Sequence, residues 1–273
     1  MNTATLDPAA VNKREASLAE PLFSIITVTW NAAAVLVPTM RSVAEQTCRN
    51  FEHLIIDGAS TDDTLRIAGE MGAGERTRIF SEPDEGLYDA MNKGMDRAKG
   101  KYLIFLNAGD AFHSADTLSR IASAVRENEM PGILYGQTQV VDEHRHRVGD
   151  RHLTAPEKLT LESFADGMVV CHQAFVVLAR IASPYNTAYR FSADYEWCIR
   201  CLQHSRRNVY VPGIMIDFLE GGLTNKNHRA SLMERFRIMC RYYGAATAVR
   251  KHIAFIPRAL RRRKKENKSS QEL

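Results

Sequence analysis

Residues 22–30, LFSIITVTW, decide the fold, because this run of β-branched and aromatic side chains is long enough for a buried strand of a parallel sheet. Asn31 follows the run and can end the strand. FEHLIID at 51–57 and KYLIFLN at 101–107 are runs of the same kind, and we expect each to form a further buried strand.

Helical segments alternate with these strands in the first half of the chain. The pattern of apolar, capping and glycine residues predicts helices over 35–46, 64–71 and 87–100, and two shorter strands are expected at 78–83 and 132–141. Strand and helix follow each other with short connections, which is typical of βαβ units. The fold class expected is therefore α/β, with a Rossmann-like, mainly parallel sheet flanked by helices.

After Val141 the pattern changes. Residues 142–152, DEHRHRVGDRH, predict a polar loop or exposed hairpin. Further on, the sequence predicts a strand in 171–179, a helix in 192–204 and strand material interrupted at Pro212-Gly213 in 208–219. We expect a polar leader at residues 1–20 and a helical basic tail at residues 226–273. Between them we expect one domain, with a nucleotide-binding half at residues 21–141 and an acceptor half at residues 142–225.

The charge of the chain is divided between its body and its tail. From Lys226 to Leu273 there are 14 Lys and Arg against three Glu, a net of +11, whereas residues 1–225 hold 22 basic and 29 acidic side chains, a net of −7. Apolar residues interleave with the cations of the tail, which favours an interfacial helix on an anionic membrane over a disordered soluble tail. No aromatic-rich RNA motif or recognition helix accompanies the charge, so no nucleic-acid partner is expected.

The composition places the protein among globular chains, with 45% hydrophobic and 25% charged residues. The start of the chain is polar and does not resemble a secretory signal, and no run of about 18 apolar residues occurs that would span a bilayer. The expected location is therefore cytoplasmic and peripheral, on the inner face of the plasma membrane.

Three predicted strands end in polar residues, at Thr29-Trp30-Asn31, at Asp57-Gly58 and at Asn107 to Asp110. If these strands are parallel, their carboxyl ends lie on one edge of the sheet, where open α/β sheets bind ligands. Two carboxylates, an amide and an aromatic ring together suit a polar ligand that carries a base or a metal-bound phosphate. The glycine-rich dinucleotide fingerprint and the P-loop lysine motif are both missing from the sequence.

Six segments, taken together and in this order, resemble family 2 glycosyltransferases: SIITVTWN, IIDGASTDDT, GLYDAMNKG, YLIFLNAGD, ADYEW and GGLT. They extend over residues 22–225, and the strongest similarity is to bacterial members that extend exopolysaccharide or lipid-linked oligosaccharides. The resemblance implies a type A glycosyltransferase fold. It also implies sugar transfer, with inversion, from a nucleoside diphosphate sugar, with uridine as the expected base, to a saccharide or polyprenyl-linked acceptor.

The resemblance also implies roles for individual residues. Asp194 becomes the general base that takes the proton of the acceptor hydroxyl. Asp110 becomes a ligand of Mg²⁺ or Mn²⁺, which would offset the charge on the departing diphosphate. The residues implied in donor binding are Val28, Trp30, Asp57, Asp89, Asn92, Lys93, Asn107, His172 and Gly222.

Several acids that relatives carry are replaced here, by Gly58, Asn107, Gly109 and Ala193. A catalytically weak nucleotide-sugar-binding or scaffold protein of the same fold is therefore the alternative. The aspartates also have purely structural explanations, as turn formers or as a helix cap. The retention of acids at four expected positions favours an enzyme, and a nucleotidyltransferase would need a basic, glycine-rich loop after the first strand, which is missing.

Overall fold

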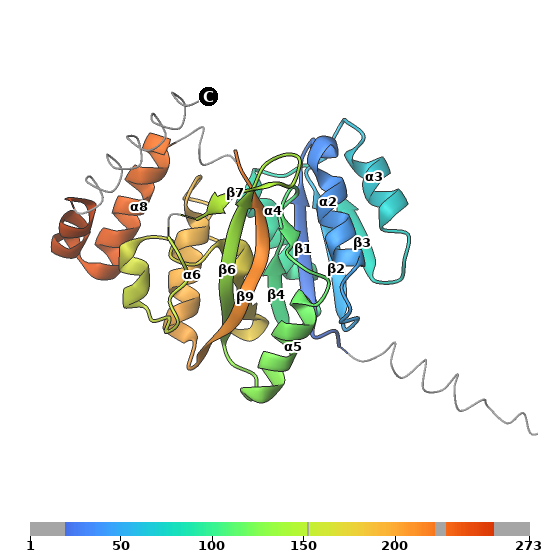
Figure 1. The fold of residues 1–273 in the computed structure, drawn as a ribbon. Helices are drawn as coiled ribbons and strands as arrows, with labels where there is room; N and C mark the ends of the chain where they lie inside the picture. The colour runs from blue at the N-terminus through green and yellow to red at the C-terminus, as the bar shows by residue number, and fades with distance from the viewer. Residues whose placement is uncertain (1–19, 152, 222–227, 254–273) are drawn as a thin grey trace, which may run out of the picture.

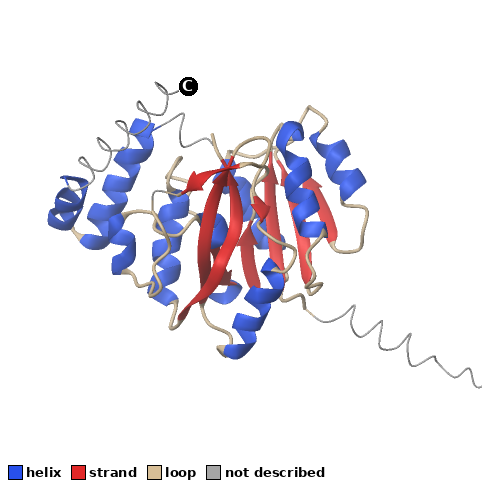
Figure 2. Ribbon diagram, viewed as in Figure 1, coloured by secondary structure: helices blue, strands red, loops and turns tan. Residues whose placement is uncertain are grey.

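The structure is a computed structural model that describes residues 20–151, 153–221 and 228–253. A mixed sheet forms its centre, and helices cover both faces of that sheet (Figures 1 and 2). The strand order is β3-β2-β1-β4-β8-β6-β9-β5, and β7 pairs with β6 outside this path. The expected α/β class is confirmed.

The first four strands form the parallel half of the sheet. They are β1 (Phe23–Thr29), β2 (Phe51–Asp57), β3 (Thr77–Ser81) and β4 (Tyr102–Phe105). All three of their pairings are parallel, as the alternation of strands and helices predicts. The register sets Thr29 opposite Asp57 and Ile26 opposite Phe105, so the polar residues that follow these strands meet at one edge, the upper edge in Figure 1.

The second half of the sheet is mixed. It contains β5 (Ala111–Phe112), β6 (Ile133–Val141), β7 (Arg147–Asp150), β8 (Phe175–Leu178) and β9 (Asn208–Leu219). Strand β8 lies between β4 and β6 and is antiparallel to both, so β6 does not continue the parallel series directly. Strand β9 runs parallel to β6 and passes through Pro212-Gly213 without ending; register shifts in the pairing, between Tyr135 and Thr138, accommodate the irregularity.

The helices are α2 (Ala33–Ala44), α3 (Thr64–Met71), α4 (Leu87–Arg97), α5 (Thr117–Glu127), α6 (Ala193–His204) and α8 (His228–Tyr243). Three short 3₁₀ turns accompany them: η1 (Glu162–Asp166), η2 (His172–Ala174) and η3 (Ala179–Ile181). The boundaries of α2, α3, α4 and α6 lie within a few residues of the ranges expected from the sequence, which reflects the strength of the helical pattern.

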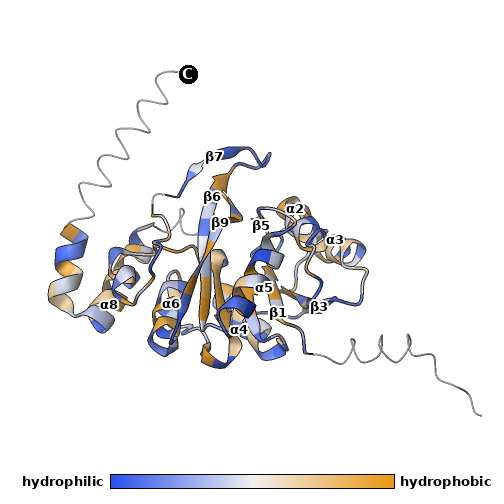
Figure 3. Ribbon diagram, turned by 60° about the horizontal axis from the view of Figure 1, so that its bottom comes forward, coloured by the Kyte–Doolittle hydropathy of each residue, from blue (hydrophilic) through white to orange (hydrophobic). Residues whose placement is uncertain are grey.

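The core is divided by the sheet, because alternate residues of each strand face opposite sides. In β1, Ile26 belongs to the core cluster that includes side chains of α4 and α6, whereas Ile25 belongs to the cluster that includes side chains of α2 and α5. Figure 3 shows hydrophobic residues in the strands of the sheet and a mixture of hydrophobic and hydrophilic residues along the helices. Burial on both faces explains why β1 and β2 lack the strict alternation of apolar and polar residues that a half-exposed strand shows.

Among the described residues, no helix combines the length and the apolar character needed to cross a bilayer.

Candidate active site

A buried carboxylate joins the ends of three parallel strands. Asp57, at the end of β2, is 1% exposed and accepts four hydrogen bonds. The donors are the hydroxyl of Thr29 (2.9 Å), the backbone N–H and hydroxyl of Ser60 (2.9 and 2.5 Å) and the hydroxyl of Ser81 (2.7 Å). Burial alone would raise the pKa of Asp57, but these hydrogen bonds outweigh it and hold the pKa below its ordinary value.

An aromatic ring lies exposed beside this strand edge. Trp30 is 70% exposed, and its ring approaches Gly58, which follows Asp57. Asp84 lies against the same glycine: a Cβ added to Gly58 would clash with Asp84 Oδ2 and stand 3.5 Å from Trp30 Cδ1. The absence of a side chain at residue 58 therefore leaves room for a carboxylate and a flat ring side by side. Asp84 was not among the residues expected from the sequence.

The predicted donor-binding residues of α4 make contacts within the protein. Asn92 accepts the backbone N–H of Tyr185 at 2.7 Å and donates to its carbonyl at 3.1 Å. Lys93 donates to the carbonyl of Pro83 at 2.7 Å and forms an ion pair with Asp89 at 3.2 Å. These side chains hold the segments around α4 in place.

The loop after β4 carries the aspartate expected to bind a metal ion. Asp110 is 4% exposed; Oδ1 accepts the backbone N–H of Leu219 at 2.9 Å, and Oδ2 accepts the amide of Gln173 at 2.6 Å. Burial raises the pKa of Asp110 to about 7, although both hydrogen bonds lower it. Nearby, Asn107 Oδ1 is buried and has no hydrogen-bond partner among the residues that the structure describes.

These side chains do not fit a site that would hold a divalent ion by protein donors alone. Each oxygen of Asp110 already accepts one hydrogen bond, and Asn107 offers only one neutral oxygen. Among the residues that the structure describes, no group of three or more His, Cys, Asp or Glu side chains is arranged to bind a metal. Mg²⁺ and Mn²⁺ prefer several oxygen ligands, carboxylates above all.

His172 and Gln173 connect two parts of the site. Gln173 contacts Asp110, whereas the ring of the adjacent His172 bonds the hydroxyl of Tyr185 through Nε2 at 2.6 Å. Burial lowers the pKa of His172 to about 4, so the ring is neutral at pH 7, and Nε2 accepts if the proton is on Nδ1. His172 also packs against Phe105 and Trp197, at ring-centroid distances of 5.2 and 5.6 Å.

The expected catalytic base lies at the start of α6. Asp194 Oδ1 accepts the hydroxyl of Tyr88 at 3.1 Å and the backbone N–H of Tyr195 at 2.8 Å. The Tyr88 ring stacks on Tyr185, 5.7 Å away, which fixes the direction of its hydroxyl. No donor of the described segments bonds Asp194 Oδ2, so this oxygen keeps lone pairs for a proton.

A chain of contacts thus links the two aspartates on which the site depends. It runs from Asp110 to Gln173, on to His172 in the same 3₁₀ turn, then through Tyr185 and Tyr88 to Asp194. Of the remaining predicted residues, Val28 has its side chain buried within β1, and Gly222 and the tail from residue 254 lie outside the described residues. The leader before Glu20 lies outside them as well.

Sequence reasoning missed Asp84, Tyr88 and Tyr185. Tyr88 lies inside a motif that was recognised, GLYDAMNKG, so its position carried a signal. Asp84 and Tyr185 had none, since their importance depends on neighbours far away in the sequence.

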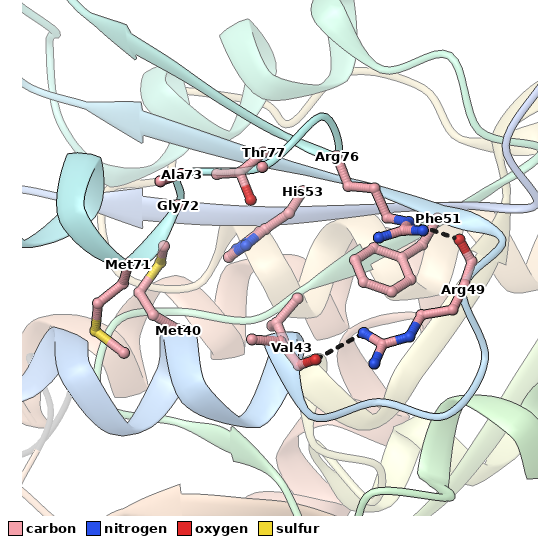
Figure 4. A pocket seen from close by; sticks show the side chains of 12 residues that line it. Met40, Val43, Arg49, Phe51, His53, Met71, Gly72, Ala73, Arg76 and Thr77 are labelled. Carbon is pink, nitrogen blue, oxygen red and sulfur yellow. Dashed lines mark hydrogen bonds between the residues drawn. The ribbon is translucent and has the colours of Figure 1, made fainter. Parts of the chain in front are cut away.

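A cavity of about 210 Å³ lies elsewhere, at the amino ends of the strands. Figure 4 shows Met40 and Met71 on one of its sides and Arg49 and Arg76 on another. Phe51, at the start of β2, lines it too, and β2 ends on the opposite edge at Asp57. The cavity is therefore separate from the polar edge at which the strands end.

Comparison with known proteins agrees with this arrangement. The model of the family described as Glycosyl transferase family 2 matches residues 24–198. A PGL/p-HBAD biosynthesis glycosyltransferase of Mycobacterium bovis is 38% identical over 215 residues, which are 76% of this chain and 81% of that protein. The putative teichuronic acid biosynthesis glycosyltransferase TuaG of Bacillus subtilis is 28% identical over 153 residues, 55% of this chain and 60% of that protein.

Solved structures with the same fold include TarS of S. aureus, residues 1–349 in complex with UDP-GlcNAc. Its TM-score is 0.66 at 17% identity, over 85% of this chain and 73% of that one. The mannosyltransferase PcManGT of Pyrobaculum calidifontis, in complex with GDP-Man and Mn²⁺, has a TM-score of 0.57 at 14% identity, over 87% and 76% of the two chains. On the match of the family model and of the mycobacterial relative, this chain belongs to glycosyl transferase family 2, and it has the type A glycosyltransferase fold.

Proposed function

We propose that the protein transfers a sugar from a UDP-sugar to a hydroxyl of a saccharide or lipid-linked acceptor, with inversion at the anomeric carbon. One observation carries this proposal: Asp194 has one oxygen held by Tyr88 and by the backbone of Tyr195, while the other is left to take a proton. Two hydrogen bonds fix the orientation of this base, and a chain of contacts connects it to Asp110. A base held in this way suits a single displacement.

In the proposed reaction the acceptor oxygen attacks the anomeric carbon and gives its proton to Asp194 Oδ2. The bond from the anomeric carbon to the diphosphate breaks, and its electron pair leaves with the diphosphate. A single displacement of this kind inverts the anomeric centre, because attack and departure occur on opposite faces.

For the nucleotide, we propose that the exposed ring of Trp30 and the carboxylate of Asp84 receive the base beside Gly58. An aromatic face stacks on a base, and a carboxylate accepts the N–H of a uracil ring. Asn107 Oδ1, an acceptor without a partner in the described part of the chain, suits a ribose hydroxyl. The complex of TarS with UDP-GlcNAc supports a uridine donor by analogy of fold.

The other predicted donor residues act, in this proposal, by positioning. Asp57 holds the strand ends, Asn92 holds the backbone of Tyr185, and His172 holds its hydroxyl. Asp89 and Lys93 fix the segment that precedes α4. Asp89 accepts the backbone N–H of Glu85 at 3.1 Å and forms an ion pair with Lys93.

The Mg²⁺ or Mn²⁺ expected from the sequence stays a prediction. The Mn²⁺ in the complex of PcManGT supports a metal ion for the fold in general. In this chain, Gln173 and Leu219 donate hydrogen bonds to the two oxygens of Asp110, which disfavours a metal ion there. No step proposed here therefore depends on a metal ion.

The acceptor is proposed from chemistry and from the relatives. The mycobacterial relative is named for PGL/p-HBAD biosynthesis, and TuaG is a putative glycosyltransferase of teichuronic acid biosynthesis. The cationic segment from Lys226 onward supports peripheral contact with an anionic membrane on the cytoplasmic side.

An assay of UDP release from a panel of UDP-sugars, with a lipid-linked acceptor extract, tests the function. Asp194→Asn should lower turnover by about 10²- to 10⁴-fold, the usual contribution of a general base, while UDP still binds. Asp96→Asn is the matched control, because Asp96 is an exposed acid on α4. If UDP binds and neither the wild type nor either variant transfers sugar, the protein is a nucleotide-binding scaffold and the proposal is wrong.

A further inference from the structure

The hairpin between β6 and β7 places Arg145 against the loop that follows β4, which contains Gly109 and Asp110. Asp142 shapes the turn: its Oδ1 accepts the backbone N–H groups of His144 and His146, at 2.9 and 2.8 Å. Arg145 adopts a left-handed backbone conformation (φ 68°), and its N–H donates to the carbonyl of Asp142 at 3.0 Å. Its neighbours in the turn are exposed, whereas Arg145 is half-buried. The turn thus directs one side chain of a solvated segment inward.

That side chain reaches the loop after β4. Arg145 Nη1 donates to the carbonyl of Gly109 at 2.7 Å, and Gly109 directly precedes Asp110. A guanidinium has five N–H donors in a planar fork. The Gly109 carbonyl is the one hydrogen-bond acceptor that it has among the described residues, and its charge also acts on the nearby Asp110 carboxyl. The other N–H donors therefore remain for an anionic ligand.

The loop after β4 leaves no room for an acidic side chain at residue 109. Gly109 has a φ of 98°, and a Cβ at this position would lie 2.8 Å from Leu219 Cδ2. The backbone N–H of Leu219 and the amide of Gln173 each hold one oxygen of Asp110. A diphosphate at this loop would therefore lie beside the Arg145 guanidinium and beside the Asp110 carboxylate, whose two oxygens each accept a hydrogen bond.

We propose that Arg145 binds the diphosphate of the donor and offsets its charge as it departs, in the place where a protein-bound divalent ion was expected. The inference rests on the proposed sugar transfer: when the bond to the anomeric carbon breaks, the diphosphate gains one negative charge. A planar guanidinium binds two phosphate oxygens at once and keeps its charge at any working pH. The bond to Gly109 holds it in place before the donor arrives.

Calorimetric titration with UDP and with uridine, each in EDTA and in Mn²⁺, tests the proposal on the full chain. The wild type should bind UDP in EDTA nearly as well as in Mn²⁺. Arg145→Gln should weaken UDP binding by about 10- to 100-fold, the range of a lost charge-assisted hydrogen bond, and leave uridine binding unchanged. Arg145→Lys should recover part of the affinity for UDP. Arg147→Gln, which removes the same charge from an exposed ion pair with Asp150 in the same hairpin, is the control and should bind like the wild type.

Each other outcome overturns the inference. If Arg145→Gln weakens the binding of uridine and of UDP equally, Arg145 only shapes the loop. If Arg145→Lys recovers no UDP affinity, the same conclusion follows, because the positive charge is then not what binds the diphosphate. If UDP binding by the wild type requires Mn²⁺ and is indifferent to Arg145→Gln, a metal ion does the work and the proposed function stands without Arg145. If the wild type binds no UDP at all, the proposed function itself fails.

Discussion

Replacing Asp57 by Asn separates a positioning role from direct contact with the nucleotide. The side chain keeps its shape but loses its charge, while four donors still point at it. The hydroxyls of Thr29, Ser60 and Ser81 can rotate, but the backbone N–H of Ser60 cannot, so the Asn oxygen must stay on that side. The new NH₂ then faces the hydroxyls of Thr29 and Ser60, which turn to accept.

The cost is the difference between charged and neutral hydrogen bonds. Hydrogen bonds to a charged group contribute about 1.5–3 kcal/mol each and neutral ones about 1 kcal/mol, and such contributions are not additive. With rotation of the hydroxyls, we expect Asp57→Asn to lower the free energy of unfolding by about 1–3 kcal/mol. Urea denaturation at pH 7 measures it as a shift of the midpoint at constant slope.

Asp63→Asn is the matched control, since it removes an acid from the same loop that is paired only at the surface, with Arg66. Its stability should hardly change. If Asp57→Asn is as stable as this control and yet binds UDP much more weakly, then Asp57 contacts the nucleotide directly and its role as a clamp of the strand ends is refuted.

Three further predictions concern the base, the core and the donor loop. Tyr88→Phe keeps the ring but removes the hydroxyl that orients Asp194, so turnover should fall about 10-fold while the Kd for UDP stays the same; unchanged turnover would show that Tyr88 does not orient the base. Burial lowers the pKa of His53 to about 3, below its unfolded value of about 6.5, so the unfolded chain binds a proton that the folded one refuses as the pH falls through this window. His53→Gln should therefore reduce the loss of stability below pH 6.5 by up to about 1.4 kcal/mol per pH unit, read from urea denaturation at several pH values, and an unaltered profile would refute it. Gly109→Ala places a methyl group against Leu219 at a left-handed φ and should cost about 1–3 kcal/mol, whereas a thermal midpoint equal to that of the wild type would show that the loop moves aside freely.

Much of the fold follows from local pattern. Apolar runs separated by helices predict parallel strands, and parallel strands place the residues after each run at one edge, as found for Trp30, Asp57 and Asn107. The pattern did not predict that β8 would lie between β4 and β6, because the order of strands in a sheet depends on which exposed edges match in the folded chain. Nor did it predict the continuity of β9 through Pro212.

The sequence by itself determined which residue types stand at the polar edge and which acids are replaced by Gly58, Asn107 and Gly109. Only the tertiary structure decided which lone pairs and N–H groups remain unused. Tyr88 meets Asp194 across 106 residues, and Arg145 meets Gly109 across 36. The periodicity of a sequence reports the side of an element on which a residue lies, but a hydrogen bond depends on the distance to a partner that another element brings. For this reason Asp57, alone at the end of its strand in the sequence, is saturated in the fold, and Arg145, in a segment that reads as solvated, points inward.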